Sequence, residues 1–261
     1  MRGYGSIKLN VPGWMEKDRP ECGPMDAILR PLMVAPCTSD THAMHGGSGE
    51  KINRILGHEA IGEVVEVGAL VKKIRPGDVA VVPCVTPDWT EEGIQRSKYN
   101  SHDIGMMGSF KFLSYKDGVM AEFFHVNCAD ANLAALPDGV TMEQALMTVD
   151  MMSTGFHGVE LAEVAYGDTV VVIGIGPVGL MAVAGAKLHG AGRIIAVGTR
   201  PNCVKIAREY GATDIVSYKD GDIVKQIVDM TGGGSDRTII AGGNHETFAQ
   251  AVAMTDRKSV V

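Results

Sequence analysis

A glycine-rich turn between an apolar strand and a helix constrains the fold of this chain more than any other feature. The apolar run at 169–173 predicts a buried strand. The turn that follows it consists of Gly174, Ile175, Gly176, Pro177, Val178 and Gly179. In this spacing the first glycine permits a tight turn, the second lets backbone approach a pyrophosphate, and the third lets the helix pack on its strand. The pattern favours a dinucleotide site at the helix N-terminus, with a turn made only for packing as the alternative.

Beyond this turn the chain repeats the alternation of strand and helix that builds parallel sheets. Further strands are expected at 193–197, 214–217 and 238–241. The helices between and after them are expected at 178–188, 201–210, 222–230 and 246–254. This pattern predicts a Rossmann sheet. Only four parallel strands can be found in it, so we expect the sheet to be incomplete at the C-terminus.

The N-terminal part of the chain has a different character. Short β-type stretches separated by glycine and proline lie at 26–31, 62–67 and 78–83. A segment at 141–165, with Thr141 at its start, is expected to be helical and to lead into the parallel sheet. The fold class is therefore mostly β followed by α/β. We expect two domains, 1–152 and 153–261.

The end of the second parallel strand predicts which dinucleotide is bound. A carboxylate normally stands there to accept the ribose 2′-hydroxyl, but this chain has Gly198, Thr199 and Arg200 instead. A guanidinium in place of a carboxylate suits a 2′-phosphate and favours NADP over NAD. Tyr218, after the third strand, is expected beside the same ribose. The alternatives are that Arg200 only starts a helix from a solvated loop and that Tyr218 is an ordinary edge aromatic.

Composition excludes several classes of protein. The net charge is −7 and no basic run is long enough to follow a phosphate backbone, so nucleic acid is not an expected partner. The five cysteines are an odd number without a Cys-x-x-Cys pair, which favours a reducing compartment, and we expect a cytoplasmic protein. The apolar run at 170–186 is interrupted by glycines and Pro177 and is shorter than a membrane span, so no membrane partner is expected.

Three possible metal ligands, Cys37, His58 and Asp150, lie far apart in the sequence, and spacing alone cannot pair them. The segment from Gly57 to Val71, with its Gly-His-Glu start, resembles the G-H-E-x2-G-x5-G-x2-V signature of zinc-containing alcohol dehydrogenases of the medium-chain superfamily. Three further stretches are similar to the NADP-dependent secondary alcohol dehydrogenases of anaerobic bacteria and some protists: 37–42, 86–89 and 149–157.

The resemblance implies a GroES-like catalytic domain with one zinc ion held by Cys37, His58 and Asp150. Glu59 would be an exchangeable ligand or a carboxylate beside the metal. Such a set leaves the fourth tetrahedral position open for substrate. No clustered cysteines lie between residues 83 and 112, so no structural zinc is expected. A buried thiol and a core histidine are the alternative reading of Cys37 and His58.

The resemblance also implies how the site works on its substrate. Ser39 would relay the proton of the alcohol, with His42 one step further out; a turn hydroxyl and a surface histidine are the alternatives. Cys84, Val85 and Phe110 would line an apolar slot for small secondary alcohols and ketones, or aldehydes. The family further implies a homotetramer.

Two other functions compete with this one. Residues 256–261 do not match the family, and relatives continue with further strands, so a C-terminally truncated fragment that binds zinc or nucleotide without turnover is one alternative. A zinc-free quinone reductase of the same superfamily is the other. It is weaker, because such an enzyme has no use for Cys37, His58 and Asp150 together.

Overall fold

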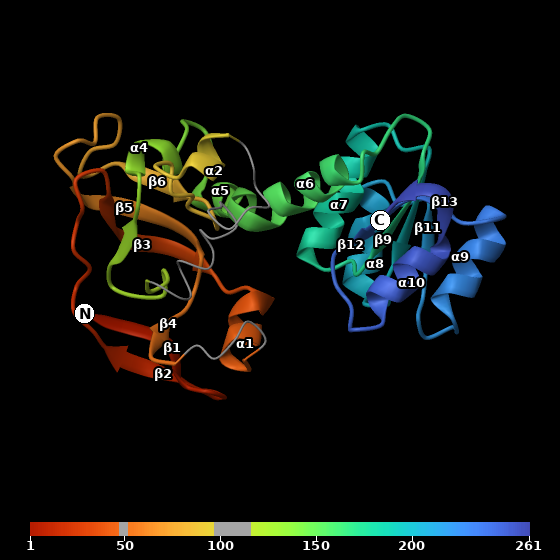
Figure 1. The fold of residues 1–261 in the computed structure, drawn as a ribbon, viewed down its shortest axis with the longest axis horizontal. Helices are drawn as coiled ribbons and strands as arrows, with labels where there is room; N and C mark the ends of the chain where they lie inside the picture. The colour runs from red at the N-terminus through yellow and green to blue at the C-terminus, as the bar shows by residue number, and fades with distance from the viewer. Residues whose placement is uncertain (47–51, 97–115) are drawn as a thin grey trace. The chain divides into compact units, whose positions relative to one another are not determined.

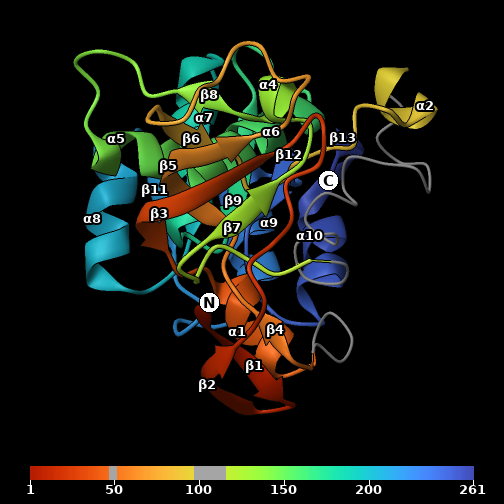
Figure 2. The ribbon, with the colours of Figure 1, turned by 90° about the vertical axis from the view of Figure 1, so that its left-hand side faces the viewer.

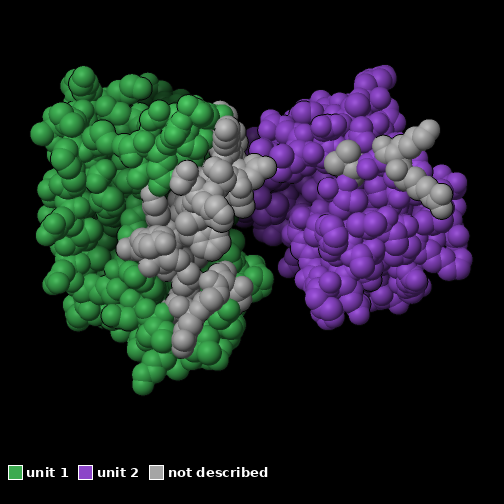
Figure 3. Space-filling view, in the orientation of Figure 1, with its two compact units in different colours: residues 1–150 green, residues 151–261 purple. Residues whose placement is uncertain are grey.

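The computed structural model describes residues 1–46, 52–96 and 116–261 (Figure 1). The chain divides into two compact units, residues 1–150 and 151–261 (Figure 3). Among the described helices, none combines the length and the hydropathy needed to cross a membrane.

The first unit is built mainly from antiparallel strands (Figure 2). Its larger sheet has the order β7-β3-β5-β6-β8, with bounds β3 Ala27–Ala35, β5 Glu59–Val67, β6 Val79–Val82, β7 Phe124–Val126 and β8 Ala134–Ala135. The smaller sheet has the order β2-β1-β4, with bounds β1 Arg2–Lys8, β2 Val11–Glu16 and β4 Arg54–Ile55. The helices in its described part are α1 Thr38–Met44, α2 Glu92–Gln95, α4 Ala129–Asn132 and α5 Met142–Met147.

The larger sheet confirms the β-type stretches expected from the sequence, whereas the smaller sheet was not predicted. Its pairing depends on glycine, because a Cβ on Gly5 would lie 2.0 Å from the carbonyl oxygen of Arg54. Such a close approach between distant backbones leaves no periodic signal in the sequence.

Both faces of the larger sheet contribute residues to apolar clusters. Leu29 and Val64 pack on one face in a cluster that includes Phe124, while Ile61 packs on the other face against Leu146 of α5. This packing fixes the end of β3, which leads to Cys37, and the start of β5, where His58 and Glu59 lie.

One nearly continuous helical segment follows, as expected for 141–165, but its middle is not α-helical. The Thr141 hydroxyl accepts a hydrogen bond from the Gln144 backbone amide, and the Gln144 side-chain oxygen accepts one from the Thr141 backbone amide, so the helix begins with a capping box. A π-helical turn, η2 (Thr148–Met152), separates α5 from α6 (Ser153–Leu161). Such turns are frequent at functional sites, and this one carries Asp150.

The second unit is a parallel sheet with the order β11-β10-β9-β12-β13. Its strands are β9 Thr169–Ile173, β10 Arg193–Val197, β11 Asp214–Val216, β12 Ser235–Ile240 and β13 Thr255–Val260. Its remaining helices are α7 Pro177–Leu188, α8 Pro201–Glu209, α9 Ile223–Thr231 and α10 Thr247–Met254. Alternate residues of β9 lie on opposite faces of the sheet. Val170 and Val172 pack with α7 and α8 on one face, and Val171 and Ile173 pack with α9 and α10 on the other.

The expectation of four parallel strands was wrong, because β13 adds a fifth. It is an edge strand with the sequence TDRKSV, which lacks the apolar run of its neighbours. Backbone pairing to β12 holds it, together with a 2.6 Å hydrogen bond between the hydroxyls of Thr238 and Thr255. A polar edge strand of this kind gives little hydrophobic signal.

Candidate metal centre and nucleotide loop

Four side chains from distant parts of the first unit meet in one cluster. Ligand atoms of Cys37, His58, Glu59 and Asp150 all lie within 4.8 Å of one another. Cys37 precedes α1, His58 and Glu59 stand at the start of β5, and Asp150 lies in the π-turn. The pairing of Ala35 with Glu59 brings the end of β3, and with it Cys37, to the start of β5.

The separations within the cluster suit a single divalent ion. His58 Nε2 lies 3.4 Å from Asp150 Oδ2, and Cys37 Sγ lies 3.9 Å from the same oxygen. Zinc binds such atoms at about 2.0–2.3 Å, so ligands that share one ion stand roughly 3 to 4 Å apart. The three residues are therefore close enough to hold one ion in common. A thiolate, an imidazole and a carboxylate are also donors that zinc accepts.

Glu59 supplies independent support for a cation at this place. Its Oε2 atom is buried and has no hydrogen-bond partner in the described part of the chain. Burial and the neighbouring Asp150 carboxylate raise the pKa of Glu59 to about 7. An unpaired buried carboxylate oxygen is costly unless something charged satisfies it. The cluster is thus short of positive charge.

Burial alone would lower the pKa of His58, but the side chains around it, Asp150 first among them, raise it to about 12. Without a metal the imidazole is therefore held as a cation by the acidic cluster. A divalent cation would take the place of that proton, since a metal-bound histidine must be deprotonated at the ligating nitrogen.

Asp40 is a part of the site that the sequence did not reveal. It is 4% exposed and its carboxylate accepts hydrogen bonds from the backbone amides of Cys37 and Gly57, each at 2.9 Å. Its Oδ1 also lies 3.6 Å from His58 Nδ1. Burial would raise the pKa of Asp40, but its contacts with His58 and the two amides lower it overall. The sequence did contain a signal for Asp40, because an acid three residues after a helix N-cap residue can complete a capping box. The signal was weak because cysteine is not a usual N-cap residue.

The other residues expected at the catalytic centre fall into two groups. The Ser39 hydroxyl lies 3.4 Å from His58 Nε2, and the backbone amide of Cys84 donates a 3.0 Å hydrogen bond to the carbonyl oxygen of Val149, the residue before Asp150. Burial and Asp150 raise the pKa of Cys84 to about 12. His42 lies in the last turn of α1 and is exposed, with no contact to the cluster among the described residues. Phe110 lies outside the described residues.

The glycine turn of the second unit has the backbone that its sequence predicts. Gly174 has a φ of +89°, and a Cβ there would stand 2.8 Å from the backbone of Gly242. A Cβ on Gly179 would stand 2.1 Å from the carbonyl oxygen of Gly174. Pro177 starts α7 directly after its N-cap residue Gly176. The free amides at the start of α7 therefore lie next to Gly174 and Gly176, where no Cβ would crowd an anionic ligand.

Residues from the next two strands gather at the same edge of the sheet. Thr199 donates a 2.7 Å hydrogen bond to the Tyr218 hydroxyl. Arg200 precedes α8, and its Nη2 atom lies 3.4 Å from the position that a Cβ on Gly176 would occupy. A guanidinium, two hydroxyls and the glycine turn thus lie together at the carboxyl ends of β9, β10 and β11.

Sequence profiles of two families match most of the chain. The profile described as alcohol dehydrogenase GroES-like domain matches residues 23–138. The profile described as zinc-binding dehydrogenase matches residues 177–261, so the expectation that residues 256–261 do not match the family was wrong.

Individual relatives agree with these profiles. An NADP-dependent isopropanol dehydrogenase of Thermoanaerobacter brockii is 59% identical over 97% of this chain and 72% of its own length. One of Entamoeba histolytica is 58% identical over 97% of this chain and 70% of its own length. The apo structure of zinc-dependent alcohol dehydrogenase 2 from Streptococcus pneumonia superposes with a TM-score of 0.88 at 30% identity, over 100% of this chain and 75% of that one.

Proposed function

This chain belongs to the zinc-binding alcohol dehydrogenase family, and on that premise we propose that it interconverts small secondary alcohols and ketones with NADP(H). The observation that carries the proposal is the meeting of Cys37, His58 and Asp150 in one buried cluster. The expected distances for a shared ion and the unsatisfied oxygen of Glu59 support it.

In this proposal Cys37, His58 and Asp150 hold one zinc ion, and Glu59 is an exchangeable ligand or stays beside the metal. Zinc, when bound, supplies a Lewis acid that lowers the pKa of an alcohol oxygen and polarises a ketone. Asp40 holds the far nitrogen of His58 and so orients the imidazole toward the cluster.

Two side chains of this chain are proposed to carry the proton of the alcohol to solvent. Ser39 stands beside the ligand nitrogen of His58, so its hydroxyl is placed to accept the proton of the alcohol. His42 lies exposed on the same helix and is proposed to take the proton from Ser39 and pass it to solvent. NADP, when bound, would supply the nicotinamide that accepts the carbinol hydride, which is the cofactor's own chemistry.

The nucleotide is proposed to lie on the glycine turn of the second domain, with NADP preferred over NAD. Arg200 and Thr199 would bind the 2′-phosphate, and Tyr218 would lie beside the ribose. The domains proposed are 1–152 for zinc and 153–261 for NADP. The strand end carries no carboxylate in the run from Gly198 to Arg200, which is the feature that favours the phosphate.

The remaining parts of the proposal concern substrate, compartment and assembly. Cys84, Val85 and Phe110 are proposed to line the slot for two small alkyl arms. A cytoplasmic location is proposed because all five cysteines are free thiols. A homotetramer is proposed by analogy with the family.

The experiment that tests the function follows NADPH oxidation with acetone as substrate. The zinc-loaded chain is compared with the chelated chain and with Cys37→Ser, and Cys22→Ser serves as the matched thiol control. Turnover should require zinc and should be lost in Cys37→Ser but kept in Cys22→Ser. Equal turnover by the chelated, metal-free chain would refute the proposal.

A further inference from the structure

Residues 83–91, between the end of β6 and the start of α2, form a segment without helix or strand. The segment begins beside the metal centre, because the backbone amide of Cys84 donates a 3.0 Å hydrogen bond to the carbonyl oxygen of Val149, the residue before Asp150. The next residue is Val85, which is half-buried and is proposed to line the substrate slot. A backbone outside helix and strand needs other partners to stay in one place, so the groups that hold this segment decide how firmly Val85 is placed.

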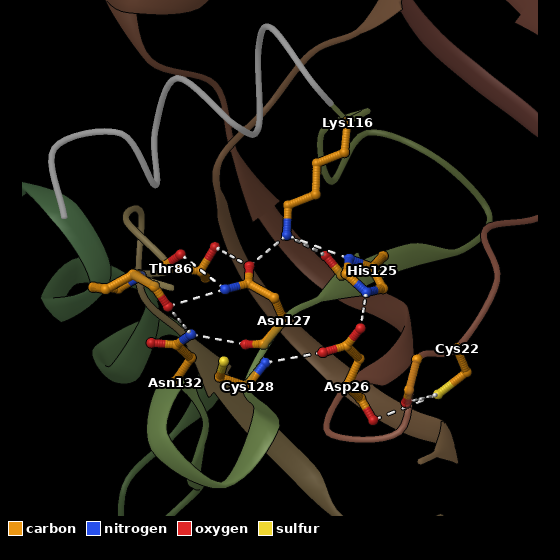
Figure 4. A network of polar contacts seen from close by, with 10 residues as sticks. Cys22, Asp26, Thr86, Lys116, His125, Asn127, Cys128 and Asn132 are labelled. Atoms are coloured by element: carbon orange, nitrogen blue, oxygen red, sulfur yellow. Dashed lines mark hydrogen bonds and ion pairs between the residues drawn. The ribbon is translucent and has the colours of Figure 1, made fainter. Parts of the chain in front are cut away.

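Two asparagines hold the segment through their side-chain amides (Figure 4). Nδ2 of Asn127 donates hydrogen bonds to the carbonyl oxygens of Thr86 and Pro87, at 3.2 and 2.9 Å. Nδ2 of Asn132 donates a 2.9 Å hydrogen bond to the same Pro87 oxygen, and its Oδ1 accepts one of 2.9 Å from the indole of Trp89. Side chains thus bind the backbone here, where a strand would use its ladder.

The other end of the Asn127 amide is satisfied as well. Its Oδ1 accepts a 3.0 Å hydrogen bond from the Thr86 hydroxyl and one of 2.7 Å from the Lys116 ammonium. Donors surround the oxygen and carbonyl groups surround the nitrogen, so only one orientation of the amide satisfies both ends. Thr86 is fully buried, and a buried polar group that loses its partner is costly.

Both asparagines are attached to packed parts of the first unit. Asn127 directly follows β7, whose residues Phe124 and Val126 belong to a buried apolar cluster. Asn132 is the last residue of α4, is buried, and donates a 2.7 Å hydrogen bond to the backbone carbonyl of Asn127. The rigidity of the core is therefore passed on to a segment that has no regular structure of its own.

We propose that Asn127 and Asn132, called the asparagine clamp from here on, are positioning residues for the substrate slot. By binding the carbonyl groups of residues 86 and 87, the clamp holds Val85 in one position relative to the metal centre, so that the slot keeps one width. The inference rests on the proposed function, because it takes Val85 as a slot residue. Neither asparagine touches substrate, metal or nucleotide in it.

Asn127→Asp tests the clamp with almost no change in side-chain shape. The new carboxylate still accepts from Lys116 and from the Thr86 hydroxyl, but it cannot donate to the two carbonyl groups and repels them. KM and kcat are measured with acetone, 2-butanone and 2-pentanone at saturating NADPH. The KM for acetone should rise about 10-fold, the size of one lost neutral hydrogen bond. The ratio of kcat/KM for 2-pentanone to that for acetone should rise about 3-fold, because a mobile wall rejects the longer alkyl arm less.

A role confined to stability gives a different result. It would lower kcat through the folded fraction and leave both KM and the ketone ratio unchanged, and that result would overturn the inference. Zinc content and the KM for NADPH should stay as in the unmodified chain. Asn10→Asp is the matched control, because Asn10 is exposed and contacts the ring of His45 through an oxygen that the carboxylate keeps.

Hydrogen exchange supplies a readout that needs no turnover. In the zinc-loaded chain, the amides of residues 84–91 should exchange about 10-fold faster in Asn127→Asp than in the unmodified chain. Peptides from β3 and β5 should keep their exchange rates. Equal exchange of residues 84–91 in both proteins would overturn the inference.

Thr86 gives a second pair of variants for the case that Asn127→Asp does not fold. Thr86→Val removes the buried hydroxyl that donates to Asn127 and nearly keeps the shape, whereas Thr86→Ser keeps the donor. We expect the KM for acetone to rise about 3-fold in Thr86→Val, less than in Asn127→Asp because Lys116 still donates to the same oxygen. Thr86→Ser should be close to the unmodified chain, and equal values in the two variants would overturn the inference.

The unmodified chain separates this inference from the function on which it rests. If it reduces acetone and Asn127→Asp does so with the same KM and the same ketone ratio, only the clamp fails. If the zinc-loaded, unmodified chain does not reduce ketones with NADPH, the proposed function is wrong and the positioning role falls with it.

Discussion

Asp40 lies against His58 with 3.6 Å between Oδ1 and Nδ1, so the carboxylate faces the imidazole nitrogen that does not face Asp150. The same carboxylate accepts backbone hydrogen bonds beside both ligand-bearing segments. A single buried acid thereby ties the start of α1 to the start of β5 and orients the histidine between them.

Replacing this acid should damage both stability and metal binding. Asp40→Ala leaves two amides and the imidazole without their acceptor, and we expect unfolding to become easier by about 3 kcal/mol. Zinc affinity should fall about 10-fold or more, because the outer partner of a ligating histidine is lost. Denaturant unfolding and chelator competition measure the two effects. The exposed Asp220→Asn serves as the control, and an unchanged unfolding midpoint for Asp40→Ala would contradict the role given to Asp40.

The glycine turn should tolerate no side chain at its first position. Gly174→Ala places a Cβ 2.8 Å from the backbone of Gly242 at a φ of +89°, so both collision and backbone strain oppose it. We expect a loss of stability of more than about 2 kcal/mol and weak NADPH binding.

Gly232→Ala is the matched control for this change. It has a positive φ of +75° but no atom within 4 Å of the new methyl group, so strain acts there without collision. It should cost only about 1 kcal/mol. Thermal unfolding and NADPH fluorescence titration compare the two variants, and equal losses would show that the close approach to Gly242 has no consequence.

Arg200 should decide the preference between the two nucleotides. Arg200→Gln removes the cation proposed for the 2′-phosphate, and loss of a charged hydrogen bond of about 1.5–3 kcal/mol corresponds to a roughly 10-fold to 100-fold rise in the KM for NADPH. The KM for NADH should change little. Arg208→Gln, an exposed arginine on the same helix, is the control. A parallel rise for both nucleotides would argue that Arg200 acts on the fold and not on the phosphate.

The polar network of Figure 4 should make the first unit sensitive to acid. His125 Nε2 lies 2.9 Å from Asp26, while its Nδ1 faces the Lys116 ammonium at 3.3 Å. Burial and Lys116 lower the pKa of His125, against which Asp26 acts only in part. The folded state therefore binds fewer protons at His125 than the unfolded state does.

It follows that stability from His125 is complete above its unfolded pKa of about 6.5 and is lost as pH falls from there toward the lower folded pKa, by at most about 1.4 kcal/mol per pH unit. Denaturant unfolding at pH 7.5 and 5.5 measures this loss. His125→Gln should lose less stability over the same interval than the unmodified chain. An identical decrease in both proteins would rule out His125 as the source.

The sequence predicted those parts of the molecule that depend on local patterns. The strand at 169–173, the glycine turn and the helix after it are specified by adjacent residues, and the structure has all three. The strands β1 and β13 escaped prediction because one relies on a close backbone approach at Gly5 and the other on edge pairing without apolar residues.

The candidate site divides in the same way. Cys37 and Asp150 are 113 residues apart, so no spacing rule could join them, and only the resemblance to a family did so. Asp40 contributes contacts to the backbone amides of Cys37 and Gly57 and to His58 that depend on the packed structure. The proton relay through Ser39 and His42 stays a prediction.

Metal content tests the central claim most directly. The chain is saturated with zinc, dialysed, and analysed for bound metal beside Cys37→Ser and the control Cys22→Ser. The account predicts one zinc ion per chain in the unmodified protein and in Cys22→Ser, and essentially none in Cys37→Ser. A metal-free unmodified chain, or equal zinc in Cys37→Ser, would contradict it.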